Sequence, residues 1–112
     1  MKNLLITFFF ISLLAFSQDF PDGMVAVEFN ASFNKSNEVS WLSKLTDCEV
    51  ERIDITADAR WSKEYKIVVV PTIVIFNNNE EVKRFQANIM MTMEATKSEV
   101  QNSIDEIVME AF

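Results

Sequence analysis

Two asparagines, Asn34 and Asn37, stand three positions apart at the start of a predicted helix that spans residues 34–45. Two thiols with this spacing could form a redox pair, because a helix N-terminus stabilises a thiolate. Amide side chains offer neither a nucleophile nor an electron pair for redox exchange. An asparagine can instead cap the helix and stabilise it by about 1 kcal/mol. We therefore expect Asn34 to be an N-cap in a site without redox chemistry.

The side chains that usually carry catalysis are scarce in this sequence. There is no histidine and there is one cysteine, Cys48. Serine–histidine and cysteine–histidine mechanisms, zinc sites of the Cys/His type and an internal disulfide are therefore excluded, and we expect no metal and no cofactor. Asp47 and Glu49 flank Cys48, and their charges disfavour a thiolate. Cys48 is either a half-buried structural thiol or a partner in an intermolecular disulfide.

Strands and helices that could position the two asparagines follow from the hydrophobic pattern. Residues 67–76 form an almost entirely apolar segment that is broken by Pro71, which is typical of a strand buried on both faces. The asparagines of residues 77–81 predict a hairpin turn, and the alternation after it predicts an edge strand. Thr96 and Glu99 form a capping box. The expected order is strand, helix, strand, helix, strand, strand, helix, over residues 25–29, 34–45, 50–55, 57–65, 67–76, 82–86 and 96–111.

Four stretches of the sequence resemble the thioredoxin family. "VAVEFNASFNKSN" is similar to the strand that leads into the family's Cys-x-x-Cys helix, and "VVVPTIVIFNNNEEVKRF" to its proline strand and hairpin. "RIDIT" and "EYKIVVVPT" fall in the corresponding order between them. The resemblance implies an α/β thioredoxin-like fold, with a mixed central sheet and flanking helices. The family's first strand and helix are missing, and Asn34-Lys35-Ser36-Asn37 replaces the two cysteines and the residues between them.

The same resemblance implies a binding groove. It places a cis Val70–Pro71 peptide bond beside the start of the 34–45 helix, where the family pairs its backbone with an extended polypeptide. Pro71 could also be purely structural, turning the chain into the central strand. Methionine side chains adapt to partners of different shapes, although two of Met90, Met91 and Met93 could simply cover the core. The residues expected to bind a partner are Phe33, Asn34, Lys35, Ser36, Asn37, Val70, Pro71, Met90 and Met91.

Glu28 matches the family's buried carboxylate, which helps to move the proton of the second cysteine. Without a thiol that role is empty, and we expect a glutamate in partial contact with solvent, Lys44 or Lys66. If Glu28 is buried instead, loss of hydration should raise its pKa.

Residues 1–17 read as a signal peptide. Lys2 precedes an apolar stretch of about 13 residues, and Ala15 and Ser17 suit a signal peptidase. A retained anchor is the alternative, but such a stretch spans only about 20 Å as a helix, against about 30 Å for a bilayer core. We expect an exported domain of residues 18–112, periplasmic or extracellular, with no membrane span after cleavage.

The net charge of the whole chain is −7, and no basic cluster stands out. Nucleic acid and anionic lipid are therefore poor partners, and a protein or peptide is the expected one, with the oligomeric state left open. The main interpretation is a redox-inactive, exported module that binds or scaffolds polypeptides. The alternatives are a thiol-disulfide oxidoreductase that uses Cys48 or a partner's thiol, and a structural subunit of an envelope assembly.

Overall fold

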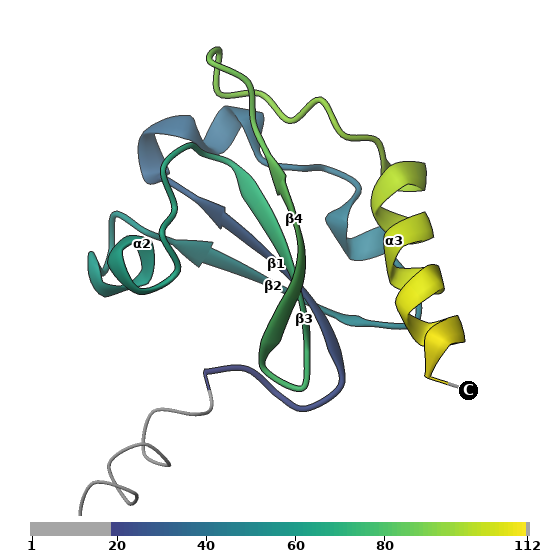
Figure 1. Cartoon of the computed structure of the whole chain (residues 1–112). Coiled ribbons are helices and arrows are strands. Elements are labelled where there is room, and N and C mark those ends of the chain that lie inside the picture. Colours follow the sequence, from purple (N-terminus) through teal and green to yellow (C-terminus); the bar gives the residue numbers. More distant parts are fainter. Residues whose placement is uncertain (1–18, 112) are drawn as a thin grey trace, which may run out of the picture.

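The computed structural model describes residues 19–111, so the expected signal peptide lies outside the described residues (Figure 1). The strands and helices follow the expected order, except that short 3-10 helices replace the first α-helix. In sequence they are β1 (Met24–Asn30), η1 (Ser32–Asn37), η2 (Leu42–Lys44), β2 (Glu49–Asp54), α2 (Arg60–Glu64), β3 (Thr72–Asn77), β4 (Glu80–Gln86) and α3 (Lys97–Glu110).

The four strands form one mixed sheet in the order β2-β1-β3-β4. β1 runs parallel to β2, whereas the pairs β1–β3 and β3–β4 are antiparallel. The two central strands carry apolar side chains on both sides, and five consecutive residues of each are buried. β4 is an edge strand, as the sequence predicts.

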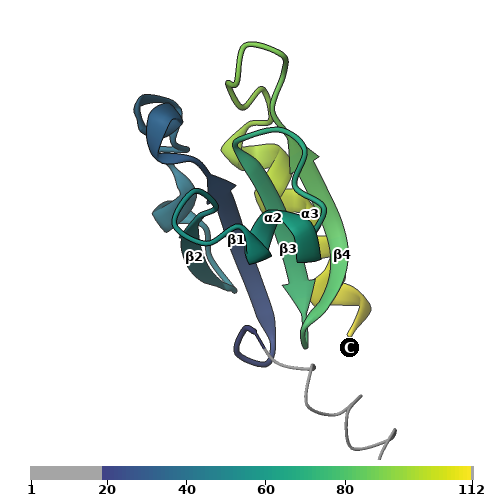
Figure 2. The same cartoon turned by 90° about the vertical axis from the view of Figure 1, so that its left-hand side faces the viewer.

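Apolar residues pack on both faces of the sheet, and Figure 2 shows α2 and α3 on opposite sides of it. On the α2 face, Trp61 and Tyr65 stack with their ring centroids 5.9 Å apart and pack against Val27 and its neighbours. On the α3 face, Val100 and Ile104 are fully buried. Alternate residues of β1 therefore point into two separate cores, which fixes the strand between two layers.

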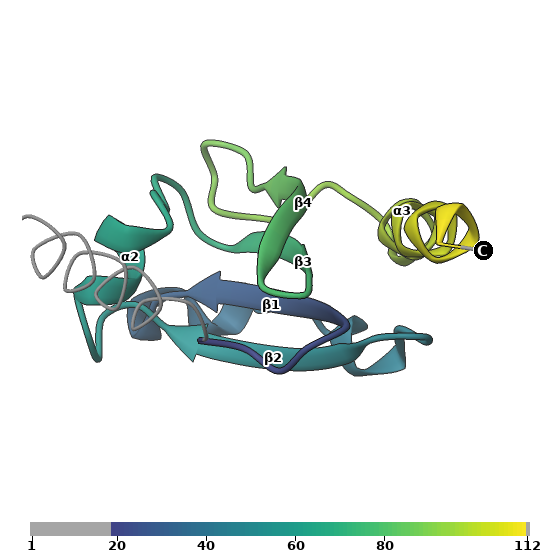
Figure 3. The same cartoon turned by 60° about the horizontal axis from the view of Figure 1, so that its bottom comes forward.

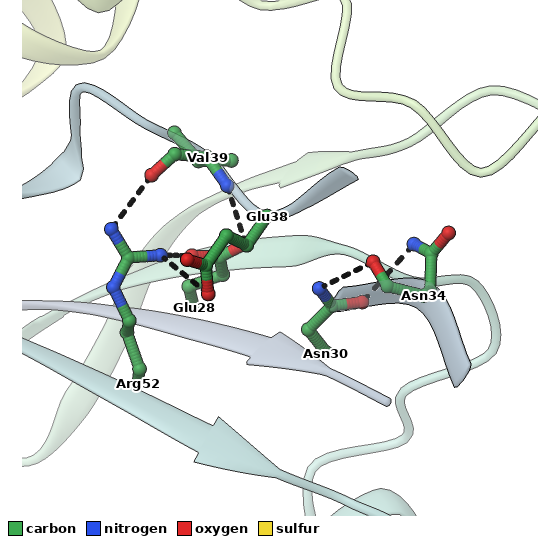
Figure 4. Close-up of polar contacts among 6 residues, drawn as sticks. All are labelled: Glu28, Asn30, Asn34, Glu38, Val39 and Arg52. Atoms are coloured by element: carbon green, nitrogen blue, oxygen red, sulfur yellow. Dashed lines mark hydrogen bonds and ion pairs between the residues drawn. The ribbon is translucent and has the colours of Figure 1, made fainter. Parts of the chain in front are cut away.

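The expected helix over residues 34–45 is wrong. Only η1 and η2 form there, and the residue before η1 is Ala31, so Asn34 is not an N-cap. A helix would need the Val39 N–H to bond to the carbonyl of Lys35. Instead this N–H donates to Glu28 Oε2 at 2.9 Å, and Arg52 Nη2 donates to the Val39 carbonyl at 2.7 Å (Figure 4). Contacts to β1 and β2 thus take both backbone groups that a continuous helix would use.

Two other boundaries differ from the expected ones by three residues or more. α2 begins after Ala59 and not at residue 57, and the backbone N–H and hydroxyl of the preceding Thr56 both bond to Asp54. β3 begins after Pro71, later than the expected strand over residues 67–76, because a proline has no N–H to donate to a neighbouring strand.

The hairpin turn and the final helix form as predicted. Asn78 and Asn79 have φ angles of 52° and 65°, which asparagine tolerates better than most residues. The turn lies at the same end of the sheet as the chain that leads into β1 (Figures 1 and 3). The capping box is present, with the Glu99 N–H 3.2 Å from Thr96 Oγ1. Within residues 19–111 no helix combines the length and apolarity needed to cross a membrane.

Candidate functional site

The end of β1 and the start of β3 bring the candidate site residues together. Phe29 pairs with Thr72 in the antiparallel register, so the chain that follows β1 lies beside the chain that precedes β3. Asn34 therefore lies next to Val70–Pro71, whose peptide bond is cis. Figure 1 shows η1, the segment before β3 and the loop after β4 at one end of the sheet, opposite the hairpin turn.

Asn34 links three segments of the chain at this end. Its side chain is buried, with an exposed fraction of 3%. Its Nδ2 donates to Asn30 Oδ1 at 3.1 Å, to the Met91 carbonyl at 3.1 Å and to the Val70 carbonyl at 3.4 Å (Figure 4 shows the first). Its Oδ1 accepts a hydrogen bond of 2.9 Å from Asn37 Nδ2. The first asparagine of the pair is thus a cross-link within the fold and not a helix cap.

The loop after β4 is organised by Asn88. Its Oδ1 accepts from the N–H of Met90 at 2.9 Å, the N–H of Thr92 at 3.2 Å and the Thr92 hydroxyl at 3.0 Å. Met91 adopts a positive φ of 60° within this loop. The loop is therefore held by its own hydrogen bonds, and it presents Ile89 and Met90 to solvent with exposed fractions of 96% and 73%.

A groove of about 290 Å³ lies between η1, the segment before Pro71 and this loop. Its rim carries apolar side chains that are unusually exposed, among them Phe33 at 73% and Val68 at 77%. Asn88 and Thr56 are the polar residues in its lining, and no charged residue of the described chain lines it. An uncharged lining stands out in a chain in which 24% of the residues are charged.

The residues expected at the site divide into three groups. Phe33, Val70 and Met91 line the groove, and Asn34 bonds to the last two of these. Asn37 holds the Asn34 amide in place. Four others lie outside the lining: Pro71 is buried, Ser36 and Met90 are exposed, and Lys35 faces a different hollow.

Sequence reasoning missed Val68, Ile89 and Asn88. The signal for Asn88 was an asparagine two residues after the end of the edge strand, a position where its side chain can close a turn. Of the three methionines, Met93 packs against the core, as the alternative interpretation allowed for two of them.

From the sequence we expected Glu28 to contact solvent, Lys44 or Lys66, and this expectation is wrong. Its exposed fraction is 1%, and it forms an ion pair with Arg52, its register partner on β2 (Figure 4). Burial raises the pKa of Glu28 above its ordinary value of 4.5, although the Val39 N–H and Arg52 act in the opposite direction. The pair borders a second, polar hollow of about 360 Å³, which Lys35 also lines. Through their hydrogen bonds to the backbone of Val39, Glu28 and Arg52 position the chain around that residue.

Cys48 lies far from the groove. Cys48 is half-buried and directly precedes β2. Ile55 lines the groove and directly follows the other end of β2, so the length of the strand separates the two residues by about 20 Å. Burial raises the pKa of its thiol, and the charge of Asp47 raises it further. In the described part of the chain, no three histidine, cysteine, aspartate or glutamate side chains gather as a metal site would require.

Comparison with known proteins identifies the fold. A thioredoxin variant from Halobacterium salinarum has 22% identity and a TM-score of 0.61, with 76% of this chain and 74% of that chain covered. The Schistosoma mansoni thioredoxin has 20% identity and a TM-score of 0.61 over 85% and 86% of the two chains. The germline-specific thioredoxin Deadhead from Drosophila melanogaster has 19% identity and a TM-score of 0.55 over 77% and 82%. No family model and no curated protein matches the sequence.

The chain therefore has a thioredoxin-like fold, as the sequence predicted. It carries one cysteine, so it has no Cys-x-x-Cys motif.

Proposed function

We propose that this protein is an exported, redox-inactive thioredoxin-like module that binds an extended polypeptide in the groove beside Val70. The observation that carries the proposal is the uncharged, apolar groove that adjoins the Asn34 cross-link. The composition of residues 1–17, which resembles a signal peptide, supports export.

The distribution of exposed apolar side chains supports a binding role. Seven large apolar side chains of the described residues are exposed, and four of them line this groove: Phe33, Val68, Ile89 and Met91. Contiguous exposed apolar surface on a small protein marks an interaction site. Because Asn88 already orders the loop that carries Ile89, binding does not have to order that loop.

The backbone at the groove supports an extended polypeptide as the partner. Neither Val69 nor Val70 donates its N–H to another described residue. A polypeptide in extended conformation can accept such hydrogen bonds through its carbonyls while its side chains enter an apolar groove. The uncharged lining favours apolar side chains in the bound segment, because burying an unpaired charge is costly.

Redox inactivity is supported by the placement of the single thiol. A thiol-disulfide exchange site needs an accessible thiolate. Cys48 is half-buried, has a raised pKa and lies beyond the opposite end of β2.

Selection of peptides displayed on phage against the purified protein tests the proposed binding. We expect enrichment of apolar, extended sequences and a loss of affinity of at least about tenfold in Val68→Asp and Ile89→Asp, since each change puts a charge on the groove rim. Val82→Asp on β4 is the matched control, because Val82 is also exposed but lies outside the groove. No enrichment, or equal binding by all three variants, would overturn the proposal.

A further inference from the structure

We propose that the free edge of β2 binds a second polypeptide strand, in which lysine or arginine alternates with apolar residues. The groove beside Val70 reaches β2 only where Ile55 and Thr56 follow the strand, whereas this surface lies along the strand itself. The inference therefore does not depend on the proposed function. The bound strand would extend the sheet beyond β2 through backbone hydrogen bonds.

The backbone of β2 is paired on one side only. The sheet order is β2-β1-β3-β4, and Figure 3 shows β2 at one margin of the sheet. The Ile55 N–H donates to the Asn30 carbonyl at 2.9 Å. Backbone groups point alternately to the two sides of a strand, so those of Val50 and Arg52 point away from β1. Among residues 19–111 these backbone groups have no hydrogen-bond partner. The edge therefore offers two donors and two acceptors to an added strand.

The two edges of the sheet differ in how they are protected. Natural edge strands avoid unwanted pairing through bulges, prolines and lysines. β4 contains Lys83, and its register with β3 shifts between Ile75 and Phe76. β2 contains neither lysine nor proline, and its register with β1 is unbroken along its whole length. β2 thus keeps the regular geometry that an added strand needs.

The side chains of β2 give this edge a negative charge. Glu49 and Glu51 lie opposite residues of β1 that belong to the core on the α2 face, so both glutamates are on that face. None of the ion pairs within residues 19–111 includes either of them. The positive charge of Arg52 is already paired with Glu28. A strand added here therefore meets two carboxylates that have no counter-charge.

Glu51 is the carboxylate that would gain most from a cation. Its Oε2 is out of contact with solvent and has no hydrogen-bond partner among residues 19–111. A carboxylate that loses hydration without compensation is costly, and a cation on a neighbouring strand would offset that cost. A hollow of about 550 Å³, lined by Glu49, Glu51, Pro21 and Cys48 among others, leaves room there for the side chains of such a strand.

These features define the sequence of the bound strand. Residues that lie directly opposite each other on neighbouring strands share a face of the sheet and interact. The residues opposite Glu49 and Glu51 are therefore lysine or arginine. The residue between them lies opposite Val50, which packs against the core on the α3 face, and is apolar. A second copy of this chain does not fit, because two acidic edges repel each other.

Peptide binding tests the backbone pairing. The probe is a fluorescein-labelled nonapeptide of alternating lysine and valine, and binding to the purified protein is measured by fluorescence anisotropy. N-methylation of the valines blocks antiparallel pairing at this register, and N-methylation of the lysines blocks parallel pairing. We expect at least one of these two peptides to bind at least about tenfold more weakly than the unmodified probe. Undiminished binding of both would overturn the inference, and so would no binding of the unmodified probe.

The charge requirement is tested with two double variants. Glu49→Gln with Glu51→Gln should weaken binding of the probe about fivefold. The matched control is Glu106→Gln with Glu110→Gln, which removes the same charge from exposed positions of α3 and should change binding less than about twofold. Equal losses in both variants would show general attraction to an acidic protein and overturn the inference.

Amide hydrogen exchange of the unchanged protein locates the bound probe. Binding should slow exchange at Val50 and Arg52 and leave β4 unaffected. If the probe protects Val69 and Val70 instead, the inference is wrong and the proposed function stands. Sedimentation shows whether the protein associates with itself. Self-association that Glu49→Gln with Glu51→Gln strengthens, with no binding of the probe, would identify a second copy as the occupant and contradict the inference.

Discussion

The side-chain amide of Asn34 lies 3.1 Å from the carbonyl oxygen of Met91, although the two residues are 57 positions apart in the chain. The same nitrogen also donates to the Val70 carbonyl at 3.4 Å. One buried amide thereby holds together the segment after β1, the segment before β3 and the loop after β4.

Replacing Asn34 should destabilise the protein according to the chemistry of the new side chain. Asn34→Ala removes the donors and acceptor and should lower the free energy of unfolding by about 1–3 kcal/mol. Asn34→Asp should cost more, because it turns a buried carboxylate toward two carbonyl oxygens. Urea denaturation measures both, and Ser36→Ala should stay within about 0.5 kcal/mol of the unchanged protein. An aspartate variant as stable as the Ser36→Ala control would contradict the role given to the amide.

Glu28 should make stability fall as the pH rises above 4.5. Its pKa is raised in the folded protein, so the folded state binds this proton more tightly than the unfolded state does. The stability from this group is therefore complete below pH 4.5, the ordinary pKa, and is lost as the pH rises through the folded-state pKa.

Comparison with Glu28→Gln isolates this effect, because glutamine does not titrate. Urea denaturation at a series of pH values gives the free energy of unfolding of both proteins. The difference, the unchanged protein minus the variant, should decrease with rising pH and then level off. A difference that increases over this range would show that the folded-state pKa is lowered.

Arg52 should contribute more to the stability of the folded protein than an ordinary surface arginine does. Its guanidinium pairs with buried Glu28 and also donates to the Val39 carbonyl. Arg52→Gln leaves an unpaired carboxylate in the core and should cost about 2–3 kcal/mol, less than for a fully buried pair because the arginine side chain is 39% exposed. The double variant with Glu28→Gln should recover most of the loss in thermal denaturation. If the double variant instead loses the sum of what the two single variants lose, Glu28 and Arg52 are not energetically coupled.

Two variants of Asn79 should separate the contribution of backbone strain to stability from the contribution of hydrogen bonds in the hairpin turn. It has a φ of 65°, and its side chain bonds to both backbone groups of Phe20 at 2.9 and 2.8 Å. Asn79→Gly keeps the backbone relaxed and should cost about 1–2 kcal/mol for the two bonds. Asn79→Ala should cost about 1 kcal/mol more, because its Cβ strains the left-handed conformation. Thermal denaturation of both variants gives the order, and equal losses would rule out the strain contribution.

Cys48 should react slowly with alkylating reagents. Its raised pKa keeps the thiol protonated, and the thiolate is the reactive form. At pH 8, iodoacetamide should modify it several-fold more slowly in the folded protein than in urea. Asp47→Asn removes a neighbouring negative charge and should speed the reaction in the folded protein. Faster modification of the folded form would reopen the oxidoreductase interpretation.

The strands, the hairpin and the final helix could be predicted because local chemistry determines them. Positive φ at Asn78 and Asn79 needs only a residue type that tolerates it. The Thr96–Glu99 capping box lies within one turn of the chain. The order of strands and helices followed from such local signals, and the thioredoxin-like fold from the resemblance of four stretches of the sequence.

The helix over residues 34–45 failed for a reason that is not local. Glu28 and Arg52 reach Val39 from two different strands and take its backbone groups. Predicting this required the β1–β2 register, which places Glu28 opposite Arg52. The sequence offers both residues but not their pairing.

The site was predicted only in part, again because some of its contacts are not local in the sequence. The resemblance implied that Asn34 lies beside Val70, but the rim of the groove depends on how a loop folds. Asn88 orders that loop through its own side chain and thereby exposes Ile89. The sequence around Ile89 and around Val68 has no hydrophobic periodicity from which their exposure could be predicted.

The most direct test of the groove as a polypeptide-binding site is a methyl NMR titration with a peptide selected by display. Val68, Ile89 and Met91 report on the groove, and Val82 and Met109 are exposed apolar controls outside it. The proposal predicts saturable shifts of the first three methyl signals and none of the other two. Shifts spread equally over both groups, or confined to the controls, would contradict it.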